Sequence, residues 1–339
     1  MATLKDISNL SGVSLATVSR AMNNSSSVKE STRLRVENAA KQLNYSPNLS
    51  ARSLRTKSTR LIGFSTEGNT NYMFSHLIDY VGDFCQENDY SLIVSNHYND
   101  PERESKIFTS LRQRGVDGII VSLVSKRSRI IPAIIDSDIP VVIFDRYLLF
   151  DQLSMGKNNF SIVLDNYKAG QLAAEHLVKL GHRRIAVAEG PSNVDIVRIR
   201  TNGFYDELAK YDLYVPPAYR FRGKFEFEDG CEIAKKILDL GENRPTAVWA
   251  HNDMMAVGIE CELTKAGLRI PEDVSVVGMD GIKLSRLIYP SLTTVAQPFR
   301  SMAQTAVDML LGKCQEGNHR TVFEPTLLMG ESTAPQKDH

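Results

Sequence analysis

The residues best suited to contact a nucleic acid lie close together near the N-terminus, in the stretch "SLATVSR". Leu15 and Ala16 can offer only apolar contact, which suits a thymine methyl group in the major groove. Arg20 follows about one helical turn later, and its guanidinium can form two hydrogen bonds with a guanine edge. The hydroxyls of Thr17 and Ser19 are better suited to phosphate oxygens. If this stretch is the second helix of a helix-turn-helix, these residues form the face that would read base pairs.

A first short helix is predicted just before this stretch. Thr3 followed by Asp6 is the pattern of a capping box, which satisfies backbone N–H groups at the start of a helix. Leu4, Ile7 and Leu10 then recur at helical spacing, so one face of this helix should be apolar.

A tight turn and a second helix should follow. Gly12 can adopt the left-handed backbone that a turn between two helices requires. Ser14 can cap the second helix, in which Val18 should face inward with Ala21 or Met22.

A third helix would close a small core over the first two. Ser31 is the expected cap, and Val36, Ala39, Ala40 and Leu43 follow at positions that share one helix face. Two helices joined by a glycine turn and covered by a third make a helix-turn-helix, which lays its second helix in the major groove. The alternative is a three-helix protein-binding module, whose core helix would not normally begin with an exposed Leu-Ala pair.

The charge distribution favours an anionic partner for this N-terminal head. The formal net charge of the chain is zero, yet residues 1–60 hold ten Lys/Arg against three acidic residues, or +7. The remaining residues therefore hold −7. A basic head on a mildly acidic body suggests that the head binds nucleic acid, although a solvated charged face is the alternative on charge alone.

The amino-acid sequence of the head resembles that of the LacI/GalR family of bacterial transcriptional regulators. The resemblance rests on "TLKDISNLSGVSLATVSRAMN" and "STRLRVENAAKQLNYSPN", and similar phrases extend it over essentially the whole chain. It implies a homodimeric repressor that binds a pseudo-palindromic operator in double-stranded DNA under the control of a small-molecule effector. The residues expected to contact DNA are Thr3, Ser14, Leu15, Ala16, Thr17, Ser19, Arg20, Asn23, Tyr45, Asn48, Ala51, Arg52, Leu54 and Arg55.

The stretch "SARSLRTKST" at residues 50–59 places Leu54 between Arg52 and Arg55. Its helix-capable residues fall short of the ~12–15 that a stable isolated helix needs, so we expect it to fold only when two copies meet on DNA. Small residues such as Ala51 would let the two helices approach closely. Leu54 would then open a base step in the minor groove and kink the duplex by ~20–90°. The alternative is a leucine that patches the surface of the body.

The body alternates short apolar runs with helical patterns, which predicts an α/β fold of two doubly wound parallel-sheet subdomains. Strands this apolar should be buried on both faces, with helices on each side of the sheet. Ligands of such sheets bind beyond the carboxyl ends of the strands, here between the two subdomains. The expected strands are "LIGFS", "SLIVSN", "GIIVSLV", "PVVIFD", "SIVLD", "RIAVAE", "AVWA" and "VSVVGMD".

The body also resembles a periplasmic-binding-protein-like effector domain, in phrases such as "EHLVKLGHRRIAVAEGP" and "PEDVSVVGMDG". The resemblance implies that the chain crosses between the subdomains three times, near residues 158–162, 290–294 and 319–323. The expected domains are the head (1–46), a hinge helix or linker (47–59) and an effector-binding and dimerisation domain (60–339). The last is divided into an N-subdomain (60–160 and 293–320) and a C-subdomain (161–292 and 321–339).

Three residues carry the expected effector site of the C-subdomain. Arg198 occupies the position at which relatives place an arginine on the oxygens of the effector, and a guanidinium fork suits neighbouring hydroxyls or a carboxylate. Asp280 follows a predicted strand and matches an acceptor for sugar hydroxyls. Phe225 matches an aromatic residue that stacks on the ligand ring, although it could also belong to the core.

Other members of the expected effector site come from loops and strand ends. Asn252 resembles a residue that can reach the ligand, whereas its neighbour Asp253 is expected to cap the following helix. Tyr72, Phe74 and Arg146 are the expected contributions of the N-subdomain. The wording "STEGNTNYMF" departs from the family pattern around Tyr72 and Phe74.

Several classes of protein are disfavoured. No apolar run is long enough to cross a membrane, and the N-terminus lacks the pattern of a signal peptide. The four cysteines are scattered and read as reduced thiols of a cytoplasmic protein with no metal or cofactor. No P-loop, GxSxG or metal-binding motif supports catalysis.

Two alternative functions stay open from the sequence. A doubly wound body could belong to a sugar-metabolising enzyme, such as a kinase or a hydrolase, because fold alone does not fix function. A DNA-binding regulator could instead be controlled by a phosphoprotein corepressor that docks on the N-subdomain. The small-molecule effector, most simply a sugar, is favoured by the arginine, phenylalanine and aspartate expected in the cleft.

Overall fold

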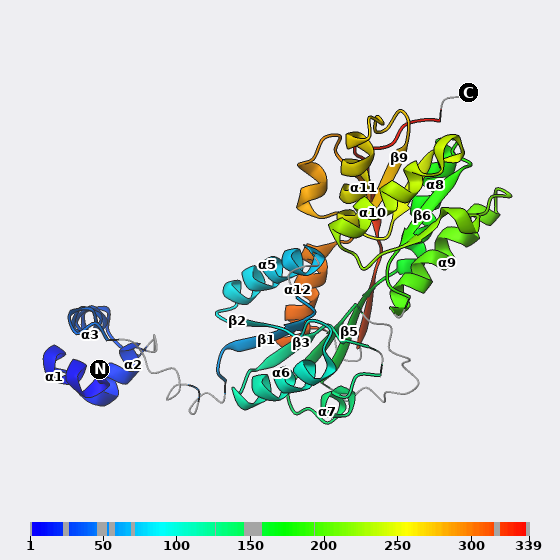
Figure 1. Ribbon diagram of the computed structural model, residues 1–339. Coiled ribbons are helices and arrows are strands. Elements are labelled where there is room, and N and C mark those ends of the chain that lie inside the picture. The colour runs from blue at the N-terminus through cyan, green and yellow to red at the C-terminus, as the bar shows by residue number, and fades with distance from the viewer. Residues whose placement is uncertain are drawn as a thin grey trace. The chain divides into compact units, whose positions relative to one another are not determined.

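The computed structural model describes residues 2–22, 27–45, 53, 58–68, 72–125, 127–145, 158–192, 194–314 and 319–336. The chain divides into two compact units, Met1–Thr59 and Arg60–His339. Figure 1 shows that the first unit is helical and that the second is built from sheets covered by helices.

The first unit, the head, is formed by helices α1 (Leu4–Ser11), α2 (Leu15–Met22) and α3 (Glu30–Gln42). Its core is small. Ile7, Val18 and Val36, one from each helix, are fully buried. Because each helix contributes only one apolar stripe, the stability of the head depends on all three packing together.

The start of the head follows the sequence prediction. The backbone N–H of Thr3 donates to Asp6 Oδ2 at 2.8 Å, and the N–H of Asp6 donates back to Thr3 Oγ1 at 3.3 Å, which confirms the capping box. The hydrogen bonds from Thr3 lower the pKa of Asp6. Gly12 adopts a left-handed backbone with φ of 68°, as the turn between α1 and α2 requires.

Two details of the head differ from the prediction. Ser31 does not cap the third helix, because α3 already begins at Glu30 and Lys29 occupies the N-cap without a side-chain hydrogen bond. Leu10 is 50% exposed, so only the first part of the apolar pattern of α1 packs into the core.

The second unit, the body, contains two six-stranded sheets. The first sheet has the strand order β11-β5-β4-β3-β1-β2, and its neighbouring strands are parallel. Its central strands are fully buried β-branched runs, as expected for a sheet that is covered on both faces. The strands are β1 (Leu61–Thr66), β2 (Ser91–Asn96), β3 (Gly118–Val121), β4 (Val141–Phe144), β5 (Asn159–Leu164) and β11 (Arg320–Phe323).

Helices cover both faces of the first sheet (Figure 1). One face packs against α5 (Tyr72–Glu87) and α12 (Phe299–Leu310), and the core between them includes Phe64, Leu77 and Met302. The other face is covered by α6 (Pro101–Gln113) and α7 (Ile131–Ile135).

The second sheet has the order β12-β10-β9-β8-β6-β7. Helices α10 and α11 pack on one face, and α8 and α9 pack on the other. The elements are α8 (Asn166–Lys179), β6 (Ile185–Glu189), α9 (Asp195–Ala209), η2 (Pro217–Tyr219), β7 (Arg220–Arg222), α10 (Phe227–Leu238), η3 (Gly241–Asn243), β8 (Ala247–Ala250), α11 (Asp253–Lys265), β9 (Ser275–Asp280), η4 (Lys283–Arg286), β10 (Thr293–Ala296) and β12 (Thr326–Leu328).

The fold class predicted from the sequence is confirmed, with one correction to the sheets. They are not wholly parallel, because β12 pairs with β10 in the antiparallel direction. Strand β12 follows β11 after a short connection and runs against β10 at the edge of the second sheet.

The chain passes between the two sheets slightly later than predicted. All of β5 belongs to the first sheet, so the first crossing follows Leu164 rather than lying at 158–162. Strand β10 belongs to the second sheet, so the second crossing lies between β10 and α12 rather than at 290–294. The third crossing follows Phe323, at the end of the predicted range 319–323.

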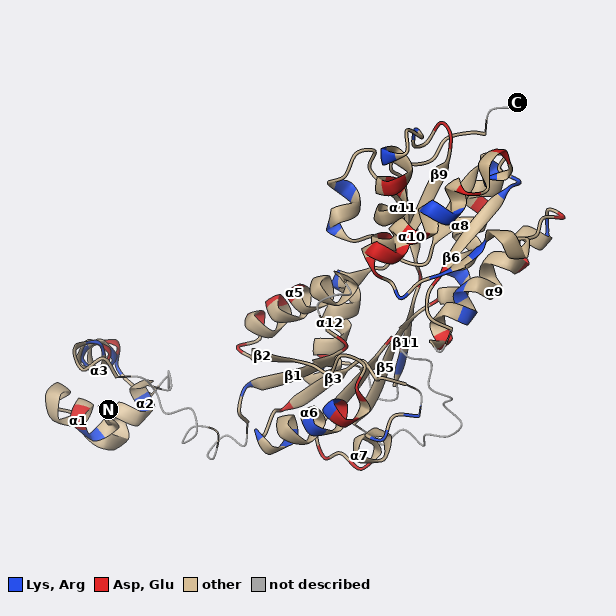
Figure 2. Ribbon diagram, in the orientation of Figure 1, with Lys and Arg blue, Asp and Glu red and all other residues tan. Residues whose placement is uncertain are grey.

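Among the described residues, no helix combines the length and the apolar character that a membrane span needs. All four cysteines are free. Figure 2 shows acidic and basic residues distributed over both halves of the body.

Candidate functional site

Helix α2 presents the predicted DNA-reading residues on the surface of the head. Leu15 is 49% exposed, and Ala16 and Arg20 are also exposed, whereas Val18 on the opposite face is buried. An exposed leucine beside an alanine is free to meet an apolar group such as a thymine methyl. The predicted face of α2 is therefore present in the structure, and its contact with DNA stays a prediction.

Local hydrogen bonds order this face. The hydroxyls of Ser14 and Thr17 share a hydrogen bond of 2.8 Å, and Ser14 Oγ accepts the backbone N–H of Thr17 at 3.2 Å, which confirms Ser14 as the cap. Arg20 Nε donates to the carbonyl of Ala16 at 3.3 Å. Thr3 is exposed but bound to Asp6, and Tyr45 is half-buried against the core of the head.

Part of the predicted site lies outside the described residues. These positions are Asn23, Asn48, Ala51, Arg52, Leu54 and Arg55 of the DNA site and Arg146 of the effector site.

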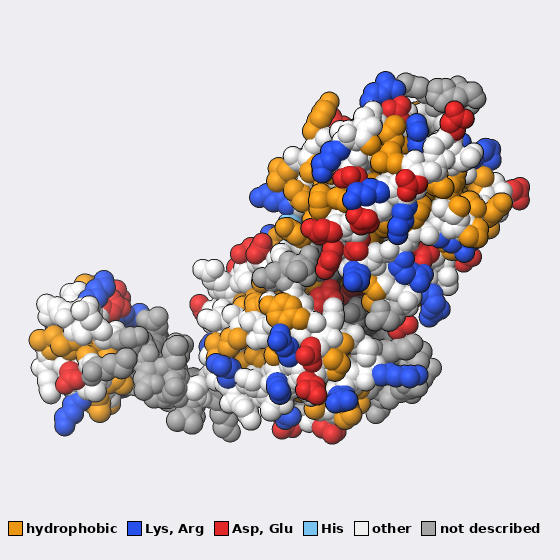
Figure 3. All heavy atoms as spheres, in the orientation of Figure 1, with side chains coloured by type: hydrophobic (Ala, Val, Ile, Leu, Met, Phe, Trp, Pro, Cys, Tyr) orange, Lys and Arg blue, Asp and Glu red, His pale blue; other side chains and the backbone are white. Residues whose placement is uncertain are grey.

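In the body, a cavity of about 370 Å³ is lined by residues from both halves. This volume is at the lower end of the ~300–1,000 Å³ typical of small-molecule sites. Figure 3 shows acidic and basic side chains gathered where the two halves meet. The wall consists of Glu67, Met73, Phe74, Asn99, Val124 and Asp145 from the first half, and of Pro191, Val194, Ile196, Arg200, Lys224, Phe225, Glu226, His251, Asn252 and Asp280 from the second.

The position of this cleft follows from the parallel sheets. Glu67 comes directly after β1 and Asp145 directly after β4, while His251 follows β8 and Asp280 ends β9. The carboxyl ends of parallel strands meet at one edge of a sheet, and open α/β sheets bind ligands there. Two such edges face each other across the cavity.

Several wall residues hold a backbone conformation that side chains rarely adopt. Among the described residues with positive φ other than glycine, Asn99 (57°), Asp145 (55°), Phe225 (75°) and Asp280 (115°) all line the cleft. Such conformations cost about 1–3 kcal/mol each and cluster at functional sites, where the surrounding structure enforces them. Their concentration supports a ligand-binding role for the cleft.

The arginine of the cleft is Arg200, not the predicted Arg198. Arg198 is exposed and does not belong to the wall, whereas Arg200 is only 3% exposed. Arg200 Nη2 and Nε donate to Asn166 Oδ1 at 2.7 and 3.1 Å, and Nη1 donates to the carbonyl of His251. Residues two positions apart in an α-helix are separated by about 200° around its axis, so Arg198 and Arg200 lie on nearly opposite sides of α9. The prediction of Arg198 therefore placed the wrong side of α9 in the cleft.

A close contact between α8 and α9 places Arg200. A Cβ atom at Gly170 would overlap the carbonyl of Arg200, and one at Gly203 would overlap the carbonyl of Tyr167. Only glycines allow the two backbones to approach this closely. Arg200 is thereby brought beside Asn166, the first residue of α8.

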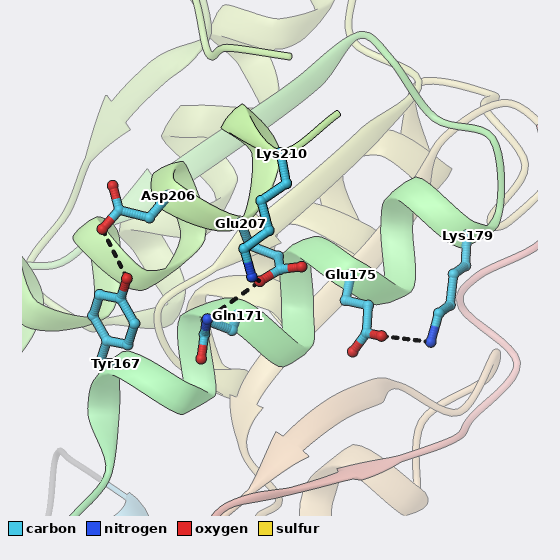
Figure 4. Close-up of polar contacts among 7 residues, drawn as sticks. All are labelled: Tyr167, Gln171, Glu175, Lys179, Asp206, Glu207 and Lys210. Atoms are coloured by element: carbon cyan, nitrogen blue, oxygen red, sulfur yellow. Dashed lines mark hydrogen bonds and ion pairs between the residues drawn. The ribbon is translucent and has the colours of Figure 1, made fainter. Parts of the chain in front are cut away.

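The outer side of the same helix pair is joined by polar contacts, as Figure 4 shows. Tyr167 Oη donates to Asp206 Oδ2 at 2.8 Å, which raises the pKa of Tyr167. Glu207 accepts from Gln171 Nε2 at 3.2 Å and from Lys210 Nζ at 2.6 Å. The bonds from Tyr167 and Gln171 join α8 to α9, whereas Lys210 binds Glu207 within the α9 segment.

Asp280 lies in the wall, as predicted, and Gln297 links it to the other half. Gln297 Nε2 donates to Asp280 Oδ1 at 2.7 Å and also contacts Met73 Sδ at 3.2 Å. Burial raises the pKa of Asp280 well above its ordinary value, and the nearby guanidinium of Arg200 only partly opposes this shift.

Asn252 lines the cleft, but its side chain is used by the protein itself. Its Oδ1 accepts the backbone N–H of Met255 at 3.0 Å, which caps α11, and its Nδ2 donates to the carbonyl of Phe225 at 2.8 Å. The predicted helix cap at Asp253 is therefore wrong. Asp253 instead accepts from Thr294 Oγ1 at 2.6 Å and from the N–H of Ile282 at 2.8 Å.

The aromatic predictions have mixed outcomes. Phe225 lines the cleft and also packs on the core of the second half. Phe74 is in the wall but only 1% exposed, so most of its surface serves the core. Tyr72 is 45% exposed and is not part of the wall, where Met73 stands beside Phe74 instead.

Sequence reasoning did not identify His251 or Glu67 as members of the site. Both come directly after or close to the end of a predicted strand, and that position was the available signal.

Comparisons with known proteins agree with this arrangement. Residues 3–48 match the family described as bacterial regulatory proteins, lacI family, and residues 174–333 match the periplasmic binding protein-like domain. The chain is 33% identical over 327 residues to the HTH-type transcriptional repressor PurR of Aliivibrio salmonicida, which covers 96% of each protein.

Solved structures extend the comparison to the fold. The lac repressor dimer bound to operator and the anti-inducer ONPF has a TM-score of 0.84 and 30% identity, covering 98% of this chain and 99% of that one. A LacI family regulator from Enterococcus faecium with bound ribose has a TM-score of 0.70 and 29% identity, covering 82% of this chain and 100% of that one. The chain belongs to the LacI family and is a DNA-binding transcriptional repressor rather than an enzyme.

Proposed function

We propose that the cleft of the body binds a sugar or a similar polyhydroxylated metabolite, and that this effector controls the affinity of the head for operator DNA. The observation that carries the proposal is the composition of the wall. Carboxyl groups from both halves, among them Glu67, Asp145 and Asp280, face a site that also contains the buried guanidinium of Arg200. Sugar hydroxyls both donate and accept hydrogen bonds, so they match a wall that contains both kinds of group.

The aromatic wall residues support the same class of ligand. The ring of Phe225 can cover an apolar face of a sugar, and Phe74 lines the cleft from the first half. The Enterococcus faecium regulator, a LacI family protein with bound ribose, supports a sugar as the ligand.

We further propose that the chain acts as a homodimer on a pseudo-palindromic operator in the cytoplasm. One head presents a single α2, which reads one half-site, and twofold symmetry doubles the readout. The lac repressor structure is a dimer bound to operator, which supports this proposal. The linker around Leu54, which lies outside the described residues, would fold and insert between base pairs in that complex.

A thermal-unfolding screen tests the effector. The full-length chain is heated with D-ribose, D-glucose, cellobiose, their amino and deoxy counterparts, and a set of purine bases and nucleosides. A ligand present at about 100 times its Kd stabilises the protein by about 2.7 kcal/mol, which raises the Tm.

The proposal expects at least one sugar to raise the Tm, and it expects Arg200→Ala to reduce that shift at the same sugar concentration. A shift produced only by purines would refute the sugar class while keeping the cleft as a ligand site. No shift from any compound, together with operator binding by the chain, would favour control by a protein corepressor.

A further inference from the structure

His251 is a buried residue of the cleft wall whose side chain is not used by the α11 cap. It is 0% exposed and follows β8 directly. Its ring lies 4.6 Å from the ring of Trp249, measured between centroids, and its carbonyl accepts from Arg200 Nη1. The ring thus packs against Trp249, and the backbone at His251 binds Arg200.

The hydrogen bonds of the ring define where its proton is. The backbone N–H of Gly190 donates to His251 Nδ1 at 3.4 Å, so Nδ1 acts as an acceptor. Burial, together with the positive charges of Arg200 and Arg222, lowers the pKa of His251 well below its ordinary value, so the ring is neutral at physiological pH. A neutral imidazole with an accepting Nδ1 carries its proton on Nε2.

This Nε2–H group has no hydrogen-bond partner within the described structure. A buried donor without a partner destabilises the folded state, so such a group in a ligand cleft calls for an explanation. Other buried polar atoms also lack partners, such as Thr201 Oγ1 on α9, but Thr201 is not part of the cavity wall. His251 combines an unpaired donor with a place in the wall.

The surroundings select the kind of group that could pair with this donor. Arg200 contacts the carbonyl of the same residue, so a second positive charge beside His251 would be repelled. An oxygen atom that accepts a hydrogen bond would satisfy the donor without repulsion. Hydroxyl and ring oxygens of a sugar meet this requirement, whereas an ammonium group at the same place does not.

We propose that His251 is a specificity-determining residue of the cleft, an inference that rests on the proposed sugar-binding function. Its Nε2–H donates a hydrogen bond to a hydroxyl or ring oxygen of the effector. An amino group at that position of the ligand is thereby disfavoured. The residue would read one oxygen of the ligand. It would add selectivity to the affinity that Arg200 and Asp280 provide.

Two variants separate this role from a structural one. His251→Phe keeps a flat ring of similar size and removes the donor, whereas His251→Gln places an amide N–H near the position of Nε2. The probes are D-ribose, D-glucose and cellobiose, each with its deoxy and amino counterparts, and affinities are measured by isothermal titration of the full-length chain. Circular dichroism and operator binding check that each variant is folded.

The proposal expects His251→Phe to weaken the best sugar about tenfold, as the loss of one buried hydrogen bond does, and His251→Gln to restore most of that loss. One deoxy sugar, lacking the oxygen that meets His251, should bind wild type and His251→Phe equally. NMR of histidine-labelled protein should show the Nε2–H tautomer in the free protein and a shift of that signal on binding.

Equal affinities of the best sugar for wild type and His251→Phe would overturn the inference while leaving the effector site intact. A folded His251→Gln variant that fails to recover affinity would show that the residue only shapes the wall, which also overturns it. If no sugar binds the wild type, the proposed function fails, and the inference fails with it.

Discussion

At the scale of single residues, the cleft is built from groups whose protonation and orientation are set by burial. Arg200 is held by Asn166 and by the carbonyl of His251, so its guanidinium has a fixed direction. Burial raises the pKa of Asp280, and the guanidinium of Arg200 only partly opposes this shift. The oxygens of a carboxyl group accept hydrogen bonds, which suits the hydroxyls of a sugar.

Arg200→Ala tests this arrangement, with Arg198→Ala as its matched control on the same helix. We expect Arg200→Ala to weaken effector binding roughly 10- to 100-fold, because hydrogen bonds to a charged group contribute about 1.5–3 kcal/mol. Arg198→Ala should bind the effector like wild type, since Arg198 is exposed and outside the wall. Titration calorimetry measures the effector affinity of both variants. A loss of affinity in Arg198→Ala but not in Arg200→Ala would contradict the assignment of Arg200 to the effector site.

Glu260 predicts a pH dependence of stability. Burial, reinforced by the charge of Asp253, raises the pKa of Glu260 to about 8. The unfolded chain ionises this group near its model value of 4.5, so between these values the folded state binds more protons than the unfolded state. The free energy of unfolding contributed by Glu260 should therefore fall as pH rises through this window and level off above it.

Urea unfolding between pH 5 and pH 9 checks this prediction. Because Glu260 binds one proton, it can change the free energy of unfolding by at most about 1.4 kcal/mol per pH unit. Glu260→Gln should make the protein more stable at pH 8 and the pH dependence shallower. Glu262→Gln, on the same helix, is the control that should retain the wild-type slope. Parallel curves for wild type and Glu260→Gln would rule out the buried carboxyl as the cause.

At the scale of elements, pairs of helices that cross at glycines position the cleft. Gly170 and Gly203 bring α8 and α9 together, and Gly230 and Gly258 do the same for α10 and α11. A Cβ at Gly230 would overlap the carbonyl of Met255, and one at Gly258 would overlap that of Phe227. The residues that begin α8, α10 and α11 lie next to these crossings. Helix packing therefore also determines where the cleft residues at the starts of these helices lie.

Gly203→Ala should destabilise the protein by about 1–3 kcal/mol, because the added methyl meets backbone that cannot move aside easily. Gly82→Ala in α5 is the matched control, since its Cβ would meet nothing within 4 Å. That change should stabilise the helix by about 0.5–1 kcal/mol. Chemical unfolding of both variants measures the difference, and equal effects of the same sign would show that the crossing is not tight.

The sequence predicted the elements with strong patterns and missed the weak ones. The strands "SLIVSN" and "AVWA" were located residue by residue because apolar β-branched runs between turns are distinctive. Strands β7, with the sequence "RFR", and β12, with the sequence "TLL", are three residues long and carry no such signal. Their pairing depends on neighbouring strands rather than on local preference.

The site was predictable in its location but not in all its residues. Asp280 was predicted from its place at the end of a strand, and Phe225 from the resemblance to the family. Both residues line the cleft. The choice between Arg198 and Arg200 depends on the rotation of α9, which is set by the glycine contact with α8. Tertiary packing of this kind cannot be read from the local pattern.

At the scale of the whole molecule, two halves that share three connections form one cleft, and a separate head carries α2. Gln297, which follows β10 on the way to α12, bonds Asp280 of one half and contacts Met73 of the other. The backbone N–H of Lys283 also donates to His76 Nε2 on α5 at 2.9 Å. A ligand that changes how the halves meet would act on these contacts.

The linker is where such a change would reach the DNA. Leu54→Ala should leave effector binding intact, reduce operator affinity strongly and abolish the bend, because an intercalating side chain kinks DNA where it inserts. Leu34→Ala removes a leucine that is 52% exposed on α3 of the head and serves as the control. Bending is measured by energy transfer between the ends of a labelled operator. An unchanged bend with Leu54→Ala would contradict the insertion of Leu54 between base pairs.

The central claim is that a ligand in the cleft and DNA at the head are energetically coupled. The most direct measurement titrates full-length protein onto an operator selected from random DNA, at one fixed salt concentration, with and without the saturating sugar found by thermal unfolding. The account predicts that the Kd for operator changes roughly 5- to 150-fold, and that operator changes the Kd for the sugar by the same factor. An operator Kd that is identical with and without bound sugar would contradict it.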